Sequence, residues 1–307
     1  MPGANTIKKN IMLLANLNCD HVLQLDAPLT AGARLHYRDA GRRLGGGAAN
    51  TGAGLCWAGH RVTVLARVGR DPTGDWLLQQ AEALGLNLDH VERVDDATGE
   101  LLVLVDSQGE RTILRQARAP ALPARLPQAP VDCLYVNTEG AEVATYMDAM
   151  NRHSLVISQY PRGGRWPRPC RIMMASAADM GAVADPWQQA RALAGEGLEW
   201  LVLTHGEDGA EAISAGRRIC VPAPVVTAVD ATGAGDAFAG GLIHALVAGA
   251  SMDDALTEAG RWAAFTLASI SSIPSGLLRD YLAGELNFPA GAGKLVTEKV
   301  SGDGFSE

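Results

Sequence analysis

The stretch that decides the fold reads Asp230-Ala231-Thr232-Gly233-Ala234-Gly235-Asp236-Ala237-Phe238-Ala239-Gly240-Gly241. It follows an apolar run, 225–229, and leads into a segment, 237–246, that is predicted to be helical. Gly233, Ala234 and Gly235 leave backbone N–H groups bare at the N-terminus of this helix, where the helix dipole favours an anion. Asp236 in the same turn would accept a proton from an attacking hydroxyl. Together these features predict phosphoryl transfer.

Two other interpretations of this stretch stay open on the residues alone. A glycine-rich turn before a helix is often only a turn, and Asp236 would then be a capping residue. A dinucleotide-binding fingerprint is a weaker fit, because a G-x-G-x-x-G pattern that begins at Gly233 and Gly235 has Phe238 at its third glycine position.

Two stretches near the N-terminus predict a binding site for hydroxyl groups. Gly45 and Gly46 lie just before a predicted helix, 48–58, and allow a polar ligand to approach the backbone. Asn50 in the first turn of that helix offers a donor and an acceptor together. Asn18 and Asp20 follow the first strand, 10–17, and point the same way from an extended chain. The alternatives are a tight turn with a packing asparagine and ordinary turn chemistry at the end of a strand.

Apolar strand patterns and helical patterns alternate along most of the chain, which indicates an α/β fold with a mostly parallel sheet and helices on both faces. Two segments, about 20–44 and 99–118, interrupt this alternation and would form a small β appendage. The last residues, 288–307, are predicted to be a flexible tail. The predicted strands are 10–17, 60–68, 133–136, 155–158, 171–174 and 200–203, and the predicted helices are 48–58, 76–84, 141–151, 185–194 and 237–246.

Composition excludes several classes of protein. Hydrophobic residues make up 47% of the 307 residues, which excludes a mainly disordered chain. A formal net charge of −8 disfavours nucleic-acid binding. No apolar stretch is long enough to cross a membrane. Five scattered cysteines without a C-x-x-C pair argue against a disulfide framework or a zinc site, so a cytoplasmic setting is expected.

Taken together, these motifs resemble the ribokinase (PfkB) family of carbohydrate kinases over nearly the whole chain, from about Ile11 to about Leu282. Two long patterns in the right order carry the resemblance. The first comprises Gly45, Gly46, Ala48, Asn50, Gly59 and Gly69, and the second comprises Asp230, Gly233, Ala234, Gly235, Asp236, Gly240 and Gly241.

The resemblance implies a three-layer fold in one domain, 1–287, with the β appendage as a lid that often also forms a homodimer interface. It implies ATP-dependent phosphorylation of a primary hydroxyl of a small sugar. A nucleoside kinase of the same fold, or a sugar-binding regulatory member with weak catalysis, is the alternative.

The resemblance also implies a role for each motif residue. Asp236 would be the catalytic base, and the 233–235 turn the anion hole. Mg²⁺ is expected with ATP, and the Asp230 and Thr232 neighbourhood helps hold K⁺ in members that need it. The implied sugar contacts are Asn18, Asp20, Gly45, Gly46, Asn50 and Glu139, and the implied nucleotide contacts are Thr204, Gly206 and Gly209.

The sequence departs from the family pattern at four places, of which two are single residues: Ala231, where Thr or Ser is common, and Gly52, where a small residue other than glycine is usual. The N-x-x-E motif that organises Mg²⁺ and phosphates is replaced by Ser176 and Asp179, of which Asp179 would still hold a metal-bound water. The return strand of the lid carries Arg115 and Arg118 in place of small residues. Arginines above a sugar pocket suit an anionic substrate, although solvated lid charges are the alternative.

Overall fold

The computed structural model describes residues 8–116, 122–161 and 166–288. Within these ranges the chain forms a nine-stranded sheet of order β13-β12-β11-β10-β9-β8-β1-β4-β5. Its strands are β1 (Asn10–Ala15), β4 (Arg61–Gly69), β5 (Val91–Val94), β8 (Cys133–Asn137), β9 (Leu155–Gln159), β10 (Ile172–Ser176), β11 (Trp200–Thr204), β12 (Ala210–Ile213) and β13 (Arg218–Val221). The pairs from β5 to β11 are parallel, and β12 and β13 are antiparallel additions at one edge.

Strand β1 lies in the interior of the sheet, between β8 and β4, where its residues after Asn10 are apolar and buried. Its register places Leu13 between Val64 of β4 and Tyr135 of β8. Alternate residues point to opposite faces, so Leu13 joins one apolar cluster while Leu14 joins the other.

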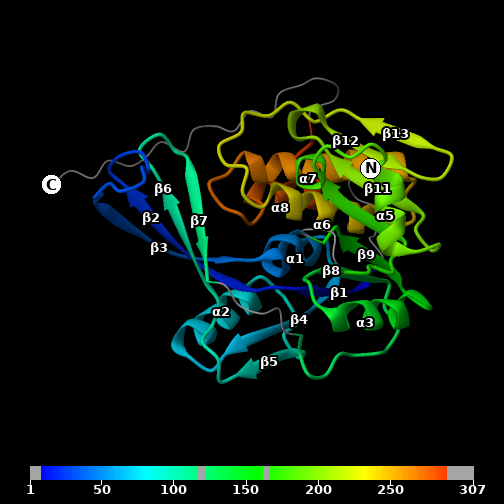
Figure 1. Cartoon of the computed structure of the whole chain (residues 1–307), viewed down its shortest axis with the longest axis horizontal. Coiled ribbons are helices and arrows are strands. Elements are labelled where there is room, and N and C mark those ends of the chain that lie inside the picture. The colour runs from blue at the N-terminus through cyan, green and yellow to red at the C-terminus, as the bar shows by residue number, and fades with distance from the viewer. Residues whose placement is uncertain (1–7, 117–121, 162–165, 289–307) are drawn as a thin grey trace.

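Helices cover both faces of this sheet, as predicted for a three-layer α/β fold (Figure 1). The cluster on one face includes residues of α1, α2, α6, α7 and α8, and the cluster on the other face includes residues of α3 and α5. The helices are α1 (Gly47–Trp57), α2 (Pro72–Ala83), α3 (Ala141–Asn151), α4 (Ala177–Met180), α5 (Pro186–Ala194), α6 (Ala234–Val247), α7 (Met252–Leu267) and α8 (Gly276–Ala283). No helix in the described ranges is long and apolar enough to cross a membrane.

Small residues on α1 and α6 allow close packing around the buried ring of Trp262. A Cβ at Gly54 would lie 2.5 Å from that ring, and a Cβ at Gly241 would lie 2.8 Å from Cα of Ala259 in α7. The glycines at the end of the quoted motif therefore fix how α6 packs. At its N-terminus α6 carries the turn 230–236, called the catalytic turn below after the role that the sequence predicts for it.

The predicted β appendage is a separate four-stranded sheet of order β3-β2-β6-β7 within the described residues. Its strands are β2 (Asn18–Leu25), β3 (Tyr37–Gly45), β6 (Glu100–Val105) and β7 (Arg111–Arg115). This sheet, called the lid below, stands to one side of the large sheet, and β7 faces the half of the molecule that holds α6, α7 and α8 (Figure 1). Residues 117 and 118 of the predicted lid segment lie outside the described ranges.

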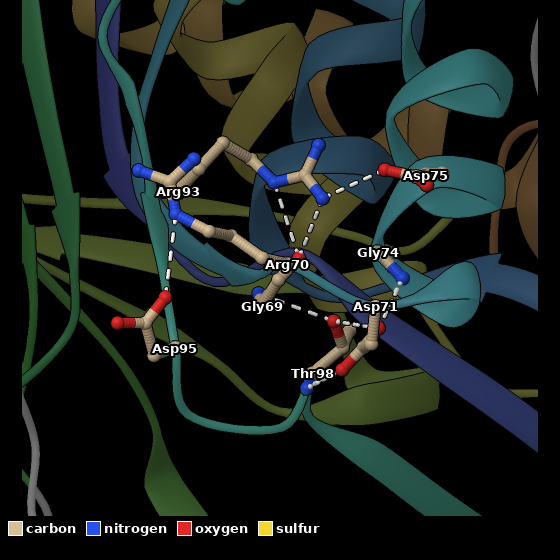
Figure 2. A network of polar contacts seen from close by, with 8 residues as sticks. All are labelled: Gly69, Arg70, Asp71, Gly74, Asp75, Arg93, Asp95 and Thr98. Carbon is tan, nitrogen blue, oxygen red and sulfur yellow. Dashed lines mark hydrogen bonds and ion pairs between the residues drawn. The ribbon is translucent and has the colours of Figure 1, made fainter.

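A network of hydrogen bonds anchors the root of the lid, just before β6 begins (Figure 2). The Asp71 carboxylate accepts from the backbone N–H groups of Gly74 and Thr98 and from the Thr98 hydroxyl, each at 2.7 Å. The Thr98 hydroxyl accepts from the N–H of Gly69 at 3.1 Å. One carboxylate therefore caps α2 and joins the end of β4 to the start of the lid.

Several boundaries differ from the sequence prediction for local reasons. Helix α6 begins at Ala234 instead of 237, because Gly233 takes a left-handed φ of 79° as its N-cap. Helix α2 begins at Pro72 because Asp71 caps it. The sequence prediction missed β5, β12, β13, α7 and α8. Phe288, assigned to the tail, packs edge-to-face on Phe265, while 289–307 lie outside the described residues.

Candidate active site

The catalytic turn is held in shape by Asp230 and Gly233. Asp230 is buried, and its Oδ1 accepts the N–H of Thr232 at 2.9 Å. A Cβ at Gly233 would lie 2.0 Å from the carbonyl oxygen of Ser272, so only glycine fits this approach and this φ. The backbone is thereby turned so that α6 starts directly after it.

Backbone N–H groups at this turn are open to a ligand. Within the described residues, the N–H groups of Gly233, Gly235 and Asp236 donate to no protein acceptor. A Cβ at Gly235 would have no atom within 4 Å, so the space beside the turn is open there. Free donors at a helix N-terminus facing open space suit an anionic group.

Asp236 lies in the first turn of α6 and is half-buried. Nδ2 of Asn50 donates to its Oδ2 at 2.9 Å, and Nδ2 of Asn137 donates to its Oδ1 at 3.3 Å. Removal from water raises the pKa of this carboxyl, and the hydrogen bond from Asn50 opposes the rise. An oriented carboxylate with a raised pKa is suited to accept a proton.

The structure brings Asn50, which was predicted as a sugar contact, to Asp236, and it adds Asn137, which the sequence prediction missed. Asn137 is the last residue of β8 and pairs in register with Ala15 of the neighbouring β1. A polar residue at the carboxyl end of an apolar strand was a signal for Asn18, and the same signal would have found Asn137.

Among the other sugar-site candidates, Asp20, Gly45 and Gly46 lie close together where lid strands β2 and β3 meet the start of α1. A Cβ at Gly45 would lie 2.2 Å from Oδ2 of Asp20, and a Cβ at Gly46 would lie 2.3 Å from the carbonyl oxygen of Asn16. The glycines therefore let the chain pass close to Asp20. Asn18 begins β2, and Glu139 follows β8 with partial exposure.

Two of the candidate sugar-binding residues carry buried acceptors without protein partners in the described part of the chain. Among the described residues, Oδ1 of Asp20 and Oδ1 of Asn50 are buried and accept no hydrogen bond. Burial raises the pKa of Asp20 to about 6, while Arg115 and Arg43 oppose the rise. A hydroxyl donor from a ligand would satisfy both acceptors.

The predicted nucleotide residues form a tight turn between β11 and β12. Thr204 ends β11, and the N–H of His205 donates to the carbonyl oxygen of Gly209 at 2.8 Å. Gly209 has a φ of 102°, and a Cβ there would lie 2.1 Å from the carbonyl oxygen of Val221. Gly206 also has a positive φ, with open space around it.

The residues present fit Mg²⁺ bound chiefly through a nucleotide. The described residues contain no group of three His, Cys, Asp or Glu side chains that could hold a metal on their own. Asp179 is exposed after β10, and Ser176 pairs in register with Thr204 of β11. One carboxylate beside the nucleotide turn matches the way Mg²⁺ is usually held, with few protein ligands and several phosphate or water oxygens.

Asp230 and Thr232 fit a further cation poorly. The guanidinium of Arg111, from the lid, forms an ion pair with Oδ2 of Asp230 and donates to the Thr232 hydroxyl at 2.5 Å. Arg43, also from the lid, donates to the carbonyl oxygen of Ile270 at 2.9 Å. Sequence reasoning missed both arginines, because nothing local in strands β3 and β7 reports which distant turn they will contact.

Comparison with known proteins finds relatives that match most of the chain. The model of the "pfkB family carbohydrate kinase" matches residues 9–145 and 173–277. A ribokinase of Haemophilus influenzae is 23% identical over 281 residues, covering 81% of this chain and 89% of that protein.

Solved structures share the fold. A nucleoside kinase of Methanocaldococcus jannaschii has a TM-score of 0.74 at 16% identity, covering 91% of this chain and 99% of that one. A ribokinase of Arabidopsis thaliana complexed with ribose and ATP has a TM-score of 0.73 at 19% identity, covering 92% and 100%.

Proposed function

This chain belongs to the pfkB family of carbohydrate kinases, and on that premise we propose that it transfers the γ-phosphoryl group of ATP to a primary hydroxyl of a small sugar. The family assignment makes it a phosphotransferase with an alcohol acceptor. The observation that carries the finer proposal is the arrangement of Asp236, whose carboxylate is held by Asn50 and Asn137 beside the free N–H groups of the 233–235 turn.

Asp236 is the proposed general base. Its two oxygens accept from different asparagines, so the carboxylate is fixed in orientation before substrate binds. The raised pKa makes it a better proton acceptor than an exposed aspartate. As the sugar oxygen attacks phosphorus in line, the hydroxyl proton passes to Asp236 and ADP leaves with the electron pair of the broken P–O bond.

The 233–235 turn is the proposed anion hole. The N–H groups of Gly233 and Gly235 donate to the oxygens of the moving phosphoryl group, whereas that of Ala234 donates to the carbonyl oxygen of Ala231. The N-terminus of α6 adds partial positive charge. Mg²⁺ bound with ATP would neutralise phosphate charge, with Asp179 near its water shell. Thr204, Gly206 and Gly209 would line the nucleotide, because their turn leaves backbone accessible at the same edge of the sheet.

Asp20 and Asn50 are the proposed anchors for sugar hydroxyls. Each has a buried oxygen that lacks a partner among the described residues, and a vicinal pair of hydroxyls supplies two donors. Asn18, Gly45, Gly46 and Glu139 complete the proposed sugar site. A lid over this site would exclude water and so limit hydrolysis of ATP.

A nucleoside is the second candidate acceptor. The likeness to the Methanocaldococcus jannaschii nucleoside kinase favours it, since that protein shares the same fold with a similar coverage of the chain. A base attached to the ribose would need room next to the lid residues, whereas a free sugar would be enclosed by them.

The proposed assembly is a homodimer through the lid. Leu102 and Leu114 pair across β6 and β7, and both are exposed apolar side chains on one lid face. The molar mass in solution, measured by light scattering, tests this part of the proposal, and a monomer would contradict it.

The experiment that tests the reaction is ADP release from Mg-ATP across a panel of pentoses, hexoses, acidic sugars, phosphosugars and nucleosides. The Asp236→Asn variant is the control. We expect a sugar to give turnover that the variant lacks. A nucleoside as the sole active acceptor would support the second candidate, and silence of the whole panel with ATP bound would support a regulatory member.

A further inference from the structure

Arg111 connects the tip of the lid to the catalytic turn. It is the first residue of β7, and its guanidinium forms an ion pair with Asp230 and donates to the hydroxyl of Thr232, 121 residues away in sequence. The Asp230 side chain is only 2% exposed, whereas the Arg111 side chain is 26% exposed. A partly exposed arginine of the lid thus places a positive charge on a buried carboxylate.

The buried carboxylate needs such a charge. Oδ1 of Asp230 accepts the N–H of Thr232, but Oδ2 accepts no hydrogen bond within the described residues, so the Arg111 charge is what it faces. An uncompensated buried carboxylate is strongly unfavourable. It would also repel an anion at Gly233, which lies three residues further along the same turn.

We propose that Arg111 is the cation of this turn, in place of the monovalent ion that the family resemblance implies at Asp230 and Thr232. Phosphoryl transfer is then independent of K⁺, and the anion hole reaches its full positive potential only when the lid lies on the turn. The inference rests on the proposed function of the same site. Arg111 acts through Asp230 and Thr232, so it is a positioning residue.

A second contact brings the lid to the same region. Arg43 of β3 donates to the carbonyl oxygen of Ile270, and Ser272, two residues further, is the residue against which Gly233 packs. The lid therefore reaches the turn from two of its strands, which couples closure over the sugar to the geometry of the anion hole.

The lid itself offers a matched control. The register of the lid sheet places Arg111, Val105, Gln24 and Arg38 in one row across its four strands. Arg38, at the opposite end of this row, is exposed and donates to Gln24 at 2.5 Å, and within the described ranges it forms no hydrogen bond or ion pair with the catalytic turn. Loss of Arg38 removes a lid charge of the same sign without touching Asp230.

The test measures turnover and melting temperature of wild type, Arg111→Met, Arg111→Lys and Arg38→Met in KCl and in tetramethylammonium chloride at equal ionic strength. We expect wild type and Arg38→Met to give the same values in both salts. We expect Arg111→Met to lose about 10²-fold in turnover, the scale of one electrostatic contact to a transition state, and to regain part of it with K⁺ or guanidinium. K⁺ should also raise its melting temperature.

A wild-type enzyme that requires K⁺, or an Arg111→Met variant as active as Arg38→Met, would overturn the proposal. The salt dependence of the melting temperature needs no substrate, so it decides between Arg111 and a bound monovalent ion even if the acceptor panel gives no turnover. Absence of turnover in wild type would count against the proposed function alone.

Discussion

The catalytic turn and the lid meet over one site but are built in different ways. The turn is fixed by backbone: Gly233 packs against Ser272 with no room for a Cβ, and Asp230 binds the N–H of Thr232. The lid meets it through long, partly exposed arginines, Arg43 and Arg111. On the proposed function, this difference predicts that the turn is preorganised for the chemistry and that the lid supplies it with positive charge.

The largest expected effect comes from removing the proposed base, Asp236, from the catalytic turn, which is the rigid half of the site. Asp236→Asn should lower turnover by at least 10²- to 10⁴-fold, the range of general-base catalysis. Its melting temperature at neutral pH should be equal or higher, because the raised pKa means that folding disfavours the ionised carboxylate. Steady-state kinetics and thermal unfolding measure the two effects, and near-normal turnover would remove Asp236 as the base.

Substitutions of Gly233 and Gly235 distinguish a loss of stability in the turn from a loss of turnover. Gly233→Ala should lower the free energy of unfolding by roughly 1–3 kcal/mol, because it adds a clash with Ser272 to a left-handed φ. Gly235→Ala should leave stability nearly unchanged, since its Cβ would meet open space, and yet lower turnover if a phosphoryl group occupies that space.

Chemical denaturation measures the free energy of unfolding of both variants, and steady-state kinetics measures their turnover. Equal loss of stability in the two variants would contradict the geometry of the turn. Full turnover in Gly235→Ala would contradict the position assigned to the phosphoryl group.

We expect the hydrogen bonds of Asp71 at the root of the lid to contribute to stability and not to turnover. Asp71→Ala removes the cap of α2 and the bonds to Thr98, and should lower the free energy of unfolding by about 1–2 kcal/mol. Turnover at low temperature should change little. Asp95→Ala is the control, because Asp95 is 98% exposed and pairs with Arg70 only at 3.5 Å, which predicts no measurable change.

The pH dependence of stability adds a second check on Asp71. Partial burial alone would raise its pKa, but the hydrogen bonds from Thr98 and Gly74 bring it below its ordinary value. A lowered carboxyl pKa contributes stability above the unfolded-state pKa, and this contribution is lost as pH falls through the folded-state pKa. The difference in stability between wild type and Asp71→Ala should therefore shrink in acid, and a constant difference would contradict the role of the charge.

The fold and the rigid half of the site could be predicted from sequence because both are encoded locally. Alternating apolar runs specify the buried parallel strands, and Gly233, Gly235 and Asp236 stand together in one turn. Asn50 was predicted as a sugar contact, and the structure adds its hydrogen bond to Asp236.

Contacts between elements that are distant in sequence could not be predicted. Arg111 and Asp230 are joined by the way the lid folds over the turn, and no spacing in the chain reports that approach. The start of α6 was also misplaced by three residues, because a left-handed Gly233 lets the helix begin inside the motif. Small β-strands such as β12 and β13 were missed for a similar reason, since their pairing at the sheet edge is set by tertiary contacts.

The smallest expected effect is on the KM of the Asp20→Asn variant. Asp20 belongs to the lid and is also a proposed sugar contact. Asp20 lies on lid strand β2 against Gly45, and its pKa of about 6 reflects burial, opposed by Arg115 and Arg43. If its ionised form binds sugar hydroxyls, KM should rise by up to about tenfold per unit as pH falls below 6. A raised carboxyl pKa has the opposite effect on folding, so stability from this group should increase over the same interval, between about pH 6 and pH 4. Asp20→Asn should flatten both profiles. If the KM of this variant still rises below pH 6, the titration belongs to another group. Asp20 would then act only as a charge partner of the lid arginines and not as a sugar contact.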